Sequence, residues 1–354
     1  MLTELPVLPG LHIDAEYVAG RRSSAARAWF DVVALTDGRA AMLVGDAADI
    51  AERGVPAAAM AAHVRAALVR MQIDDRNANG VLRRLSLAIN AGCPAGATTA
   101  SVAVIDPIDG EIQYSHCGPR PPVPVLTPDN TRHLRSPADG IDGADRPVVG
   151  RDRLGPDEVL VLCSNGSGEQ LPRLEDVQQV RTEAVCRSAA DHMRRASPGH
   201  EIAFLAVQRR RHVPRFEMTV PAVADSLDSV GDAIGDWLGE LRSSVEDGAG
   251  MALAIGEAML NAVTHAFVGD RAGSVMVEAT LLADGVVVCF VRDNGRWLPP
   301  RSAGPNRRGG GFGLMARVCD RFLIHREPGG TVVELRRRLH HPVIGHGTVT
   351  TLPS

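Results

Sequence analysis

The chain has 354 residues, which is enough for two domains with separate hydrophobic cores. With 45% hydrophobic and 23% charged residues it has the composition of a globular protein, and its net charge of −4 gives no reason to expect nucleic-acid binding. No apolar run approaches the length of a membrane-spanning helix, and the N-terminus lacks a basic region followed by an apolar core. We therefore expect a cytoplasmic protein with no membrane partner.

Cysteine and lysine usage exclude several kinds of chemistry. The six cysteines form no CxxC pair, so we expect neither a zinc cluster nor a disulfide framework. The chain has no lysine, and all 38 cationic residues are arginine. A Walker-type lysine and a lysine Schiff base are thereby excluded. Any bound phosphate must be held by backbone N–H groups, arginine or a metal ion.

The first two thirds of the chain alternate between strand and helix patterns. Strand patterns at 28–35 and 39–47 are joined by a turn, and helix patterns follow at 55–71 and 81–91. Four further strand patterns, with a helix pattern at 174–196 before the last of them, lie at 98–106, 110–118, 158–166 and 201–207. This alternation predicts a large α+β layer structure over residues 1–207.

A basic segment containing a proline, residues 208–215, interrupts the pattern and predicts a linker. The pattern then restarts and predicts a second domain over 216–339. Its expected elements are a strand at 216–220, helices at 222–242 and 247–267, strands at 274–282 and 285–292, a helix at 312–321, and strands at 321–327 and 331–338. Residues 340–354 show no periodicity and predict a loose tail.

The stretch GEAMLNAVTHAF, residues 256–267, predicts an apolar helix that carries one polar row. Glu257, Asn261 and His265 are four residues apart and therefore stack on one side of the helix. Two interpretations stay open at this point: a solvated face, or a row aimed at a ligand. We interpret His265 as structural in either case.

Three later motifs favour a nucleotide as that ligand: VRDNG (291–295), RRGGGFGLMARV (307–318) and PGGTVVEL (328–335). Asp293 at a strand end can accept the amino hydrogen of adenine, and Gly295 permits close approach of the backbone. Glycines lead directly into a helix whose free N–H groups suit phosphate: Gly309, Gly310, Gly311 and Gly313. Arg307 and Arg308 either contact phosphate or belong to a solvated lid. Asn261 can bind Mg²⁺, and Glu257 can orient or deprotonate an attacking hydroxyl.

Together these motifs resemble the GHKL ATP-binding fold, and specifically bacterial anti-sigma-factor serine kinases, over about residues 214–339. The resemblance implies a two-layer α/β (Bergerat) sandwich that binds ATP and Mg²⁺. It also implies roles for four residues: Glu257 as general base, Asn261 as magnesium ligand, Asp293 as adenine reader, and Thr331 near the adenine. The sequence departs from the family's DxGxG pattern at Trp297, which stands where the second glycine is expected.

The first domain resembles the metal-dependent type 2C (PPM) serine/threonine phosphatases of the SpoIIE-like branch, over about residues 10–207. The stretches DPIDGEIQYSHCGPRPPVPV and DEVLVLCSNGSGE carry the clearer signatures. The resemblance implies an α/β/β/α sandwich in which aspartates hold two Mn²⁺ or Mg²⁺ ions, and a bridging water attacks phosphorus. The succession of the two domains is typical of actinobacterial regulators.

The acids of this phosphatase pattern are only partly present. Asp46 stands at the first ligand position, but the loop after it lacks the family's histidine. Asn165 replaces an aspartate of the TDG triplet, and His200–Glu201 replace a closing aspartate pair. The family's run GDWYD corresponds to ARAWFD in this chain, which keeps only the last aspartate, Asp31. An amide oxygen carries no compensating charge, so the set Asp46, Asn165 and Glu201 predicts impaired metal binding and a pseudophosphatase.

The leading functional hypothesis is a partner-switching regulator of bacterial stress signalling. Its ATP- and Mg²⁺-binding domain would phosphorylate a serine on an antagonist protein or sequester a sigma factor, beside an impaired phosphatase-fold domain. Two alternatives stay open. One is an active Mn²⁺- or Mg²⁺-dependent phosphatase acting on a phosphorylated anti-sigma antagonist, and the other is a catalytically silent binding scaffold. A monomer and a homodimer are equally compatible with the sequence.

Overall fold

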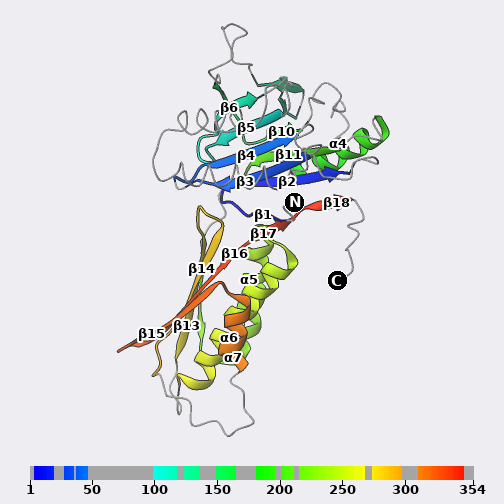
Figure 1. Cartoon of the computed structure of the whole chain (residues 1–354). Coiled ribbons are helices and arrows are strands. Elements are labelled where there is room, and N and C mark those ends of the chain that lie inside the picture. The colour runs from blue at the N-terminus through cyan, green and yellow to red at the C-terminus, as the bar shows by residue number, and fades with distance from the viewer. Residues whose placement is uncertain are drawn as a thin grey trace. The chain divides into compact units, whose positions relative to one another are not determined.

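The computed structural model describes the residues 4–19, 28–35, 37–46, 99–117, 123–128, 130–134, 149–164, 181–196, 201–210, 215–267, 273–296 and 310–346. The chain divides into two compact units, and each is described by itself (Figure 1). Unit 1 comprises Met1–Leu5, Gly10–Arg211 and Pro342–Ser354, and unit 2 comprises Pro6–Pro9 and His212–His341. Within the described ranges, no helix combines the length and apolar composition needed to cross a membrane.

Unit 1 contains two sheets that pack against each other through β11, β10, β3 and β4. The first sheet, in spatial order, consists of β18 (Ile344–His346), β2 (Leu11–Val18), β11 (Ile202–Arg209), β10 (Val159–Cys163), β7 (Pro124–Leu126) and β8 (Thr131–His133). The second consists of β3 (Ala28–Ala34), β4 (Ala40–Asp46), β5 (Thr99–Ile105), β6 (Glu111–Cys117) and β9 (Gly150–Arg153). Helix α4 (Thr182–Ala196) packs on β2 and β11. The described part thus forms helix, sheet and sheet layers.

The central strands of unit 1 are buried on both faces, which explains their sequences. Every residue of β4 and of β10 is buried, and both strands read as nearly continuous apolar runs. Helix α4 contributes one apolar side to this core, made of Val185, Cys186, Ala189, Ala190 and Met193. The helix patterns predicted at 55–71 and 81–91 lie outside the described residues.

Over its described residues, unit 2 is a two-layer sandwich of one antiparallel sheet and three helices. The sheet order is β12 (Phe216–Pro221), β13 (Ser274–Leu281), β14 (Val286–Asp293), β16 (Gly330–Arg338) and β15 (Arg321–Glu327). Helices α5 (Asp225–Glu240), α6 (Val245–His265) and α7 (Gly310–Val318) form the second layer (Figure 1). This arrangement confirms the predicted α+β class and the two-layer sandwich of the second domain.

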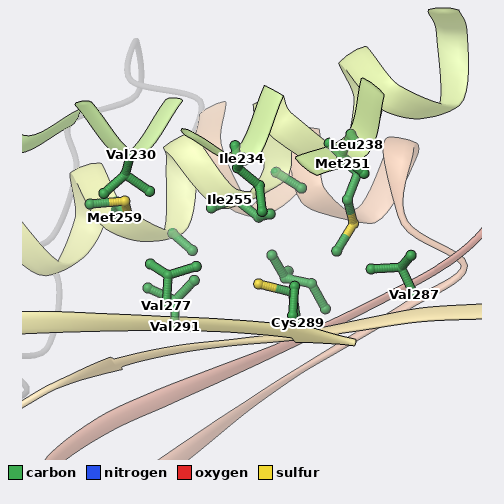
Figure 2. Close-up of a cluster of buried hydrophobic side chains, with 14 of the residues drawn as sticks. Val230, Ile234, Leu238, Met251, Ile255, Met259, Val277, Val287, Cys289 and Val291 are labelled. Atoms are coloured by element: carbon green, nitrogen blue, oxygen red, sulfur yellow. The ribbon is translucent and has the colours of Figure 1, made fainter. Parts of the chain in front are cut away.

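The core of unit 2 lies between the helices and one face of the sheet. Figure 2 shows Val230, Ile234 and Leu238 of α5 and Met251, Ile255 and Met259 of α6 above alternate residues of the strands, which are Val277, Val287, Cys289 and Val291. Burying one such side chain is worth roughly 1.5–3 kcal/mol relative to leaving it in water. Val7, from the N-terminal segment of this unit, is fully buried in the same core.

The structure differs from the sequence-based expectation mainly at the two ends of the chain and in short strands. Strands β1 (Glu4–Pro6), β2, β7, β8 and β9 were not predicted, and β11 runs to Arg209, two residues into the predicted linker. Where the sequence predicts a loose tail, the structure has β17 (His340–Pro342) and β18, and β18 pairs with β2 in parallel. Most of these strands have only three or four residues, too few to show a period.

Candidate functional site

Helix α6 carries the predicted polar row, and its local sequence explains where it begins. The Ser244 hydroxyl oxygen accepts a hydrogen bond from the Asp247 N–H at 3.0 Å and caps the first turn. Glu257 and Asn261 lie in the second half of the helix and are partly buried, whereas His265 is exposed in the last turn. The row therefore divides into an inner pair and an outer histidine.

The N-terminus of α7 lies against this inner pair. A Cβ atom added at Gly311 would lie 2.8 Å from Glu257 Oε2 and 3.3 Å from Asn261 Nδ2. Only glycine fits this approach without displacing the two side chains. The first turn of α7, with its free N–H groups and positive dipole end, is thus placed beside a carboxylate and an amide.

A second polar cluster forms where β14 ends. Asp293 is paired with Thr331 across β14 and β16. Asp293 Oδ1 accepts hydrogen bonds from the Gly295 N–H at 2.9 Å and from the Thr331 N–H at 3.3 Å. Burial raises the pKa of the Asp293 carboxyl above its ordinary value, although these two N–H groups and the Thr331 side chain act in the opposite direction. Both bonds use Oδ1.

Two glycines and a threonine shape the surroundings of Asp293. A Cβ at Gly295 would lie 2.4 Å from the Ala266 carbonyl oxygen, and one at Gly330, whose φ is 151°, would lie 1.8 Å from the Asp293 carbonyl oxygen. Thr331 is only 3% exposed, and its side chain interacts with the Asp293 carboxylate.

Both clusters lie along the same helix. Glu257, Asn261 and Ala266 follow one another on α6, and the nine residue steps from Glu257 to Ala266 correspond to roughly 13 Å of helix. The structure thus brings together Glu257, Asn261 and Gly311 at one end and Asp293, Gly295 and Thr331 at the other. Gly310 begins α7, and a Cβ at Gly313 would meet no atom within 4 Å. Gly309, Arg307, Arg308 and Trp297 lie outside the described residues.

Unit 1 brings two of its predicted acids together. Asp46, at the end of β4, is paired across the sheet with Ala28 of β3. The Ala28 N–H donates to Glu201 Oε1 at 2.9 Å. Tyr17 of β2 donates its hydroxyl to Glu201, and burial, this bond and the charges of Glu201 and Asp46 raise the pKa of Tyr17 far above its ordinary value. Asp46 and Glu201 are both buried.

Asp31 does not join this pair. Asp31 is buried and is paired with Leu43. It stands three residues after Ala28 on β3, and successive side chains of a strand alternate between the two faces of the sheet. The Asp31 side chain therefore lies on the face opposite to that of Ala28 and Asp46. Asn165 and His200 lie outside the described residues. Among the described residues, no group of three or more Asp, Glu, His or Cys side chains could hold a metal ion.

Sequence reasoning missed two residues of this second site. Ala28 stands at the position of the first aspartate in the run GDWYD, and it is the residue that faces Asp46. Tyr17 was missed because the strand that carries it was not predicted. Aligning ARAWFD on its last aspartate and following the alternation of strand β3 would have placed Ala28, and not Asp31, beside Asp46.

Comparison with known proteins agrees with both units. Residues 220–337 match the histidine kinase-like ATPase domain, and residues 36–216 match stage II sporulation protein E (SpoIIE). The anti-sigma F factor of Heyndrickxia coagulans is 26% identical over 117 residues, which cover 30% of this chain and 80% of that protein. The crystal structure of the RsbU and RsbW domains of Rv1364c from Mycobacterium tuberculosis matches with a TM-score of 0.78 and 25% identity over 98% of each chain.

The two units therefore define a class of protein: a phosphatase-fold domain followed by a histidine kinase-like ATPase domain. Since the match to SpoIIE covers about half of the sequence, the chain belongs to the SpoIIE family. This confirms the predicted resemblance to SpoIIE-like phosphatases and to GHKL domains of the anti-sigma type.

Proposed function

We propose that the protein is a partner-switching regulator. Unit 2 would bind ATP with Mg²⁺ and act as an anti-sigma-type serine kinase domain. Unit 1 would serve as a phosphatase-fold regulatory module whose metal binding is weakened. The partners would be a sigma factor or a serine-bearing antagonist protein.

The observation that carries the nucleotide part is the partly buried Asp293 carboxylate at the end of β14, which lies beside Thr331 and next to the closely approaching backbone at Gly295 and Gly330. Asp293 accepts both backbone bonds through Oδ1, and its Oδ2 would accept the amino hydrogen of a base. Because positions 295 and 330 carry no side chain, the backbone there approaches Ala266 and Asp293 closely. The residues present thus fit an adenine nucleotide.

The other end of the site fits phosphate and magnesium. Asn261 would provide an oxygen ligand to Mg²⁺, and the N–H groups at the start of α7 would receive phosphate oxygens. Glu257 would accept the proton of an approaching seryl hydroxyl. Bound ATP would supply the transferable phosphoryl group. Positioning and charge neutralisation are what such a transfer requires most from the protein.

Nucleotide titration tests this part. We expect ATP with Mg²⁺, but not Mg²⁺ alone, to raise the thermal transition of unit 2, because a ligand of the folded state stabilises it. Asn261→Ala should abolish the rise, whereas His265→Ala, the outer member of the same row, should retain it. A wild-type chain that shows no stabilisation by ATP in calorimetry would contradict the proposal.

Weakened metal binding in unit 1 is supported by Ala28 and by the bonds to Glu201. The residue opposite Asp46 has no carboxylate, and Glu201 already accepts bonds from the Ala28 N–H and from Tyr17. We therefore expect little Mn²⁺-dependent hydrolysis of a phosphoserine peptide by the wild type. Restoring acids with Ala28→Asp and Asn165→Asp should increase both Mn²⁺ affinity and hydrolysis.

Because Asp46 and Glu201 lie close together, an active phosphatase with altered metal preference is the second candidate function. If the wild type hydrolyses the peptide with Mn²⁺ and Asp46→Ala abolishes this activity, the weakened-metal proposal is wrong. If neither hydrolysis nor ATP binding occurs, the protein is a catalytically silent binding scaffold.

The partner class is supported by two relatives. One is named an anti-sigma F factor, and the other combines domains named RsbU and RsbW in the same order over nearly its whole length. A purified antagonist or sigma factor from the same genome, titrated against the full chain with and without ATP, tests this part. Binding that ATP does not alter would argue against partner switching.

A further inference from the structure

Helix α6 exposes an apolar side that none of the described elements of unit 2 covers. The helix packs on the sheet by one side, and α5 and α7 pack against it. On the side opposite its buried residues, Val245, Leu253 and Leu260 are 90%, 47% and 44% exposed. Ala249 and Gly256 are also exposed, so the row reads Val245, Ala249, Leu253, Gly256 and Leu260, with the exposed Glu246 at its edge.

This row is longer than scattered surface residues would produce. Its spacing of four, four, three and four residues keeps it on one side of the helix. The fifteen residue steps from Val245 to Leu260 correspond to about 22 Å. Single exposed leucines are ordinary, but a continuous apolar row on a helix that is also apolar toward the core is characteristic of a helix with a further partner.

Helix α5 carries a row of opposite character. Its exposed side holds five acids at spacings of three and four residues, which are Asp225, Asp228, Asp232, Asp236 and Glu240. Neither α5 nor α6 contains an arginine, and the nearest cation in the sequence is Arg242 in the turn between them. The acidic row has the same length as the apolar row.

The two rows run side by side. Only residues 241–244 connect α5 to α6, so the helices are antiparallel neighbours. Figure 2 shows Val230, Ile234 and Leu238 facing Met259, Ile255 and Met251, respectively. This alignment places Asp236 at the level of Leu253 and Asp232 near the level of Gly256. Packed helices lie 8–10 Å apart, so one segment lying along α6 would reach both rows.

We propose that these two rows, named here the α5–α6 surface, dock an amphipathic helix of a partner protein that is apolar on one side and basic along one edge. The partner's apolar side would cover Leu253 and Leu260, and its lysine or arginine side chains would face the acids of α5. This deepens the proposed function and rests on it for the class of partner, since a partner-switching domain must hold another protein.

Charge complementarity favours this occupant over a second copy of the chain. A two-fold dimer through the α5–α6 surface would set the acidic row of one subunit against the same surface of the other. Like charges facing each other across an interface are unfavourable, whereas a basic partner gains both attraction and faster association. The sequence of α5 offers no cation to relieve the repulsion between copies.

The test uses the full-length chain and an 18-residue peptide with leucines three and four residues apart, flanked by lysines. A matched peptide carries glutamates in place of the lysines. We expect the lysine peptide to bind at least tenfold more tightly at low salt, with affinity falling as salt rises. Leu253→Ser with Leu260→Ser, and separately Asp232→Asn with Asp236→Asn, should each reduce binding at least tenfold. Ile108→Ser and Asp157→Asn, exposed in unit 1, should not.

The absence of lysine from the chain permits a direct map of the contact. A carbodiimide couples carboxylates to amines, and the chain's own N-terminus is its only competing primary amine. Coupled lysine peptide should therefore be found by mass spectrometry on the acids of α5. Coupling spread evenly over the acids of both units would overturn the proposal.

Two further outcomes separate this inference from the proposed function. Val245→Ser should leave ATP affinity unchanged, because Val245 begins α6 and lies sixteen residues, about 24 Å of helix, before Asn261. If ATP binding is absent but the peptide still binds at α5, the nucleotide proposal fails and the docking surface stands. A concentration-dependent dimer of the wild type that Leu253→Ser abolishes would show that a second copy is the occupant, and the inference would be wrong.

Discussion

Thr331 lies beside Asp293 in the proposed nucleotide site. Thr331→Val keeps the shape of the side chain and removes the hydroxyl that interacts with Asp293. We expect the free energy of unfolding of unit 2 to fall by no more than about 1 kcal/mol, while ATP affinity falls about fivefold, equivalent to one lost hydrogen bond of about 1 kcal/mol. Calorimetric titration and thermal melting of the same variant check both parts. A destabilised variant with unchanged ATP affinity would assign Thr331 to the fold alone.

Asp247 makes unit 2 sensitive to acid. Its Oδ1 accepts from Arg337 Nε at 3.0 Å and Nη2 at 2.6 Å, and its Oδ2 accepts from the His340 N–H at 2.8 Å. Burial alone would raise the pKa of Asp247, but the hydrogen bonds and charge of Arg337 and the bonds from His340 bring it below its ordinary value. The charged form is therefore the one that stabilises the fold.

The sign of the pH dependence follows from this depressed pKa. The stabilisation is complete above the unfolded-state pKa of about 3.9 and is lost as the pH falls toward the folded-state pKa. Asp247→Asn should lower the free energy of unfolding by on the order of 3 kcal/mol near pH 7, since it leaves Arg337 without its carboxylate. Urea unfolding at several pH values should show this difference shrinking below about pH 4. Asp232→Asn, an exposed acid, serves as the control.

The candidate residues differ in how far the sequence could identify them. Glu257 and Asn261 were predictable because the helical period alone places them on one side of α6, and glycines mark the approach of α7. Ala28 and Tyr17 were not, since their meeting with Asp46 and Glu201 depends on which strands pair and in what register. Those pairings join residues as far apart in the sequence as Ala28 and Glu201, and a local pattern cannot specify them.

At the scale of elements, α5 contains three glycines that its own packing does not require. Gly231, Gly235 and Gly239 lie four residues apart, and a Cβ at any of them would meet no atom within 4 Å. Glycine inside a helix costs roughly 0.5–1 kcal/mol relative to alanine. Gly235→Ala should therefore stabilise unit 2 by about that amount, measured as a higher denaturant midpoint.

The same substitution at Gly295 should have the opposite sign. There the new Cβ would meet the Ala266 carbonyl oxygen at 2.4 Å, so the loop after β14 must move away from α6. We expect Gly295→Ala to destabilise unit 2 and to weaken ATP binding, while Gly235→Ala leaves ATP binding unchanged. Equal effects of the two substitutions would mean that available space does not decide their outcome.

The sequence predicted elements well where one apolar face dominates and poorly where charge interrupts the pattern. The strands of unit 2 alternate clearly, and their predicted bounds agree with the structure to within one or two residues. Strand β2 was missed because LHIDAEYV carries Asp14 and Glu16. Glu16 is nevertheless buried, and its Oε1 accepts from Arg194 Nη2 of α4 at 2.6 Å. A buried carboxylate with a distant partner looks like a surface residue in the sequence.

At the scale of the whole molecule, neither unit is one continuous piece of chain. Unit 2 includes Pro6–Pro9 from the N-terminal end, and unit 1 includes Pro342–Ser354 from the C-terminal end. Each unit thus includes one segment that is separated, along the sequence, from the rest of that unit by residues of the other unit. A boundary drawn from sequence patterns alone, between 207 and 216, omits both segments because their role depends on distant pairing.

Val7 provides the test of this arrangement. It is fully buried in the core of unit 2, and its N–H donates to the Leu339 carbonyl oxygen at 3.0 Å. Val7→Ala in the full chain removes two buried methyl groups, and we expect a loss of about 2 kcal/mol from unit 2. The affected thermal transition should be the one that ATP raises. Val125→Ala, an equally buried valine of unit 1, should lower the other transition instead. If Val7→Ala leaves the ATP-sensitive transition unchanged, the N-terminal segment does not stabilise unit 2, and a fragment beginning at residue 212 would be a complete ATPase domain.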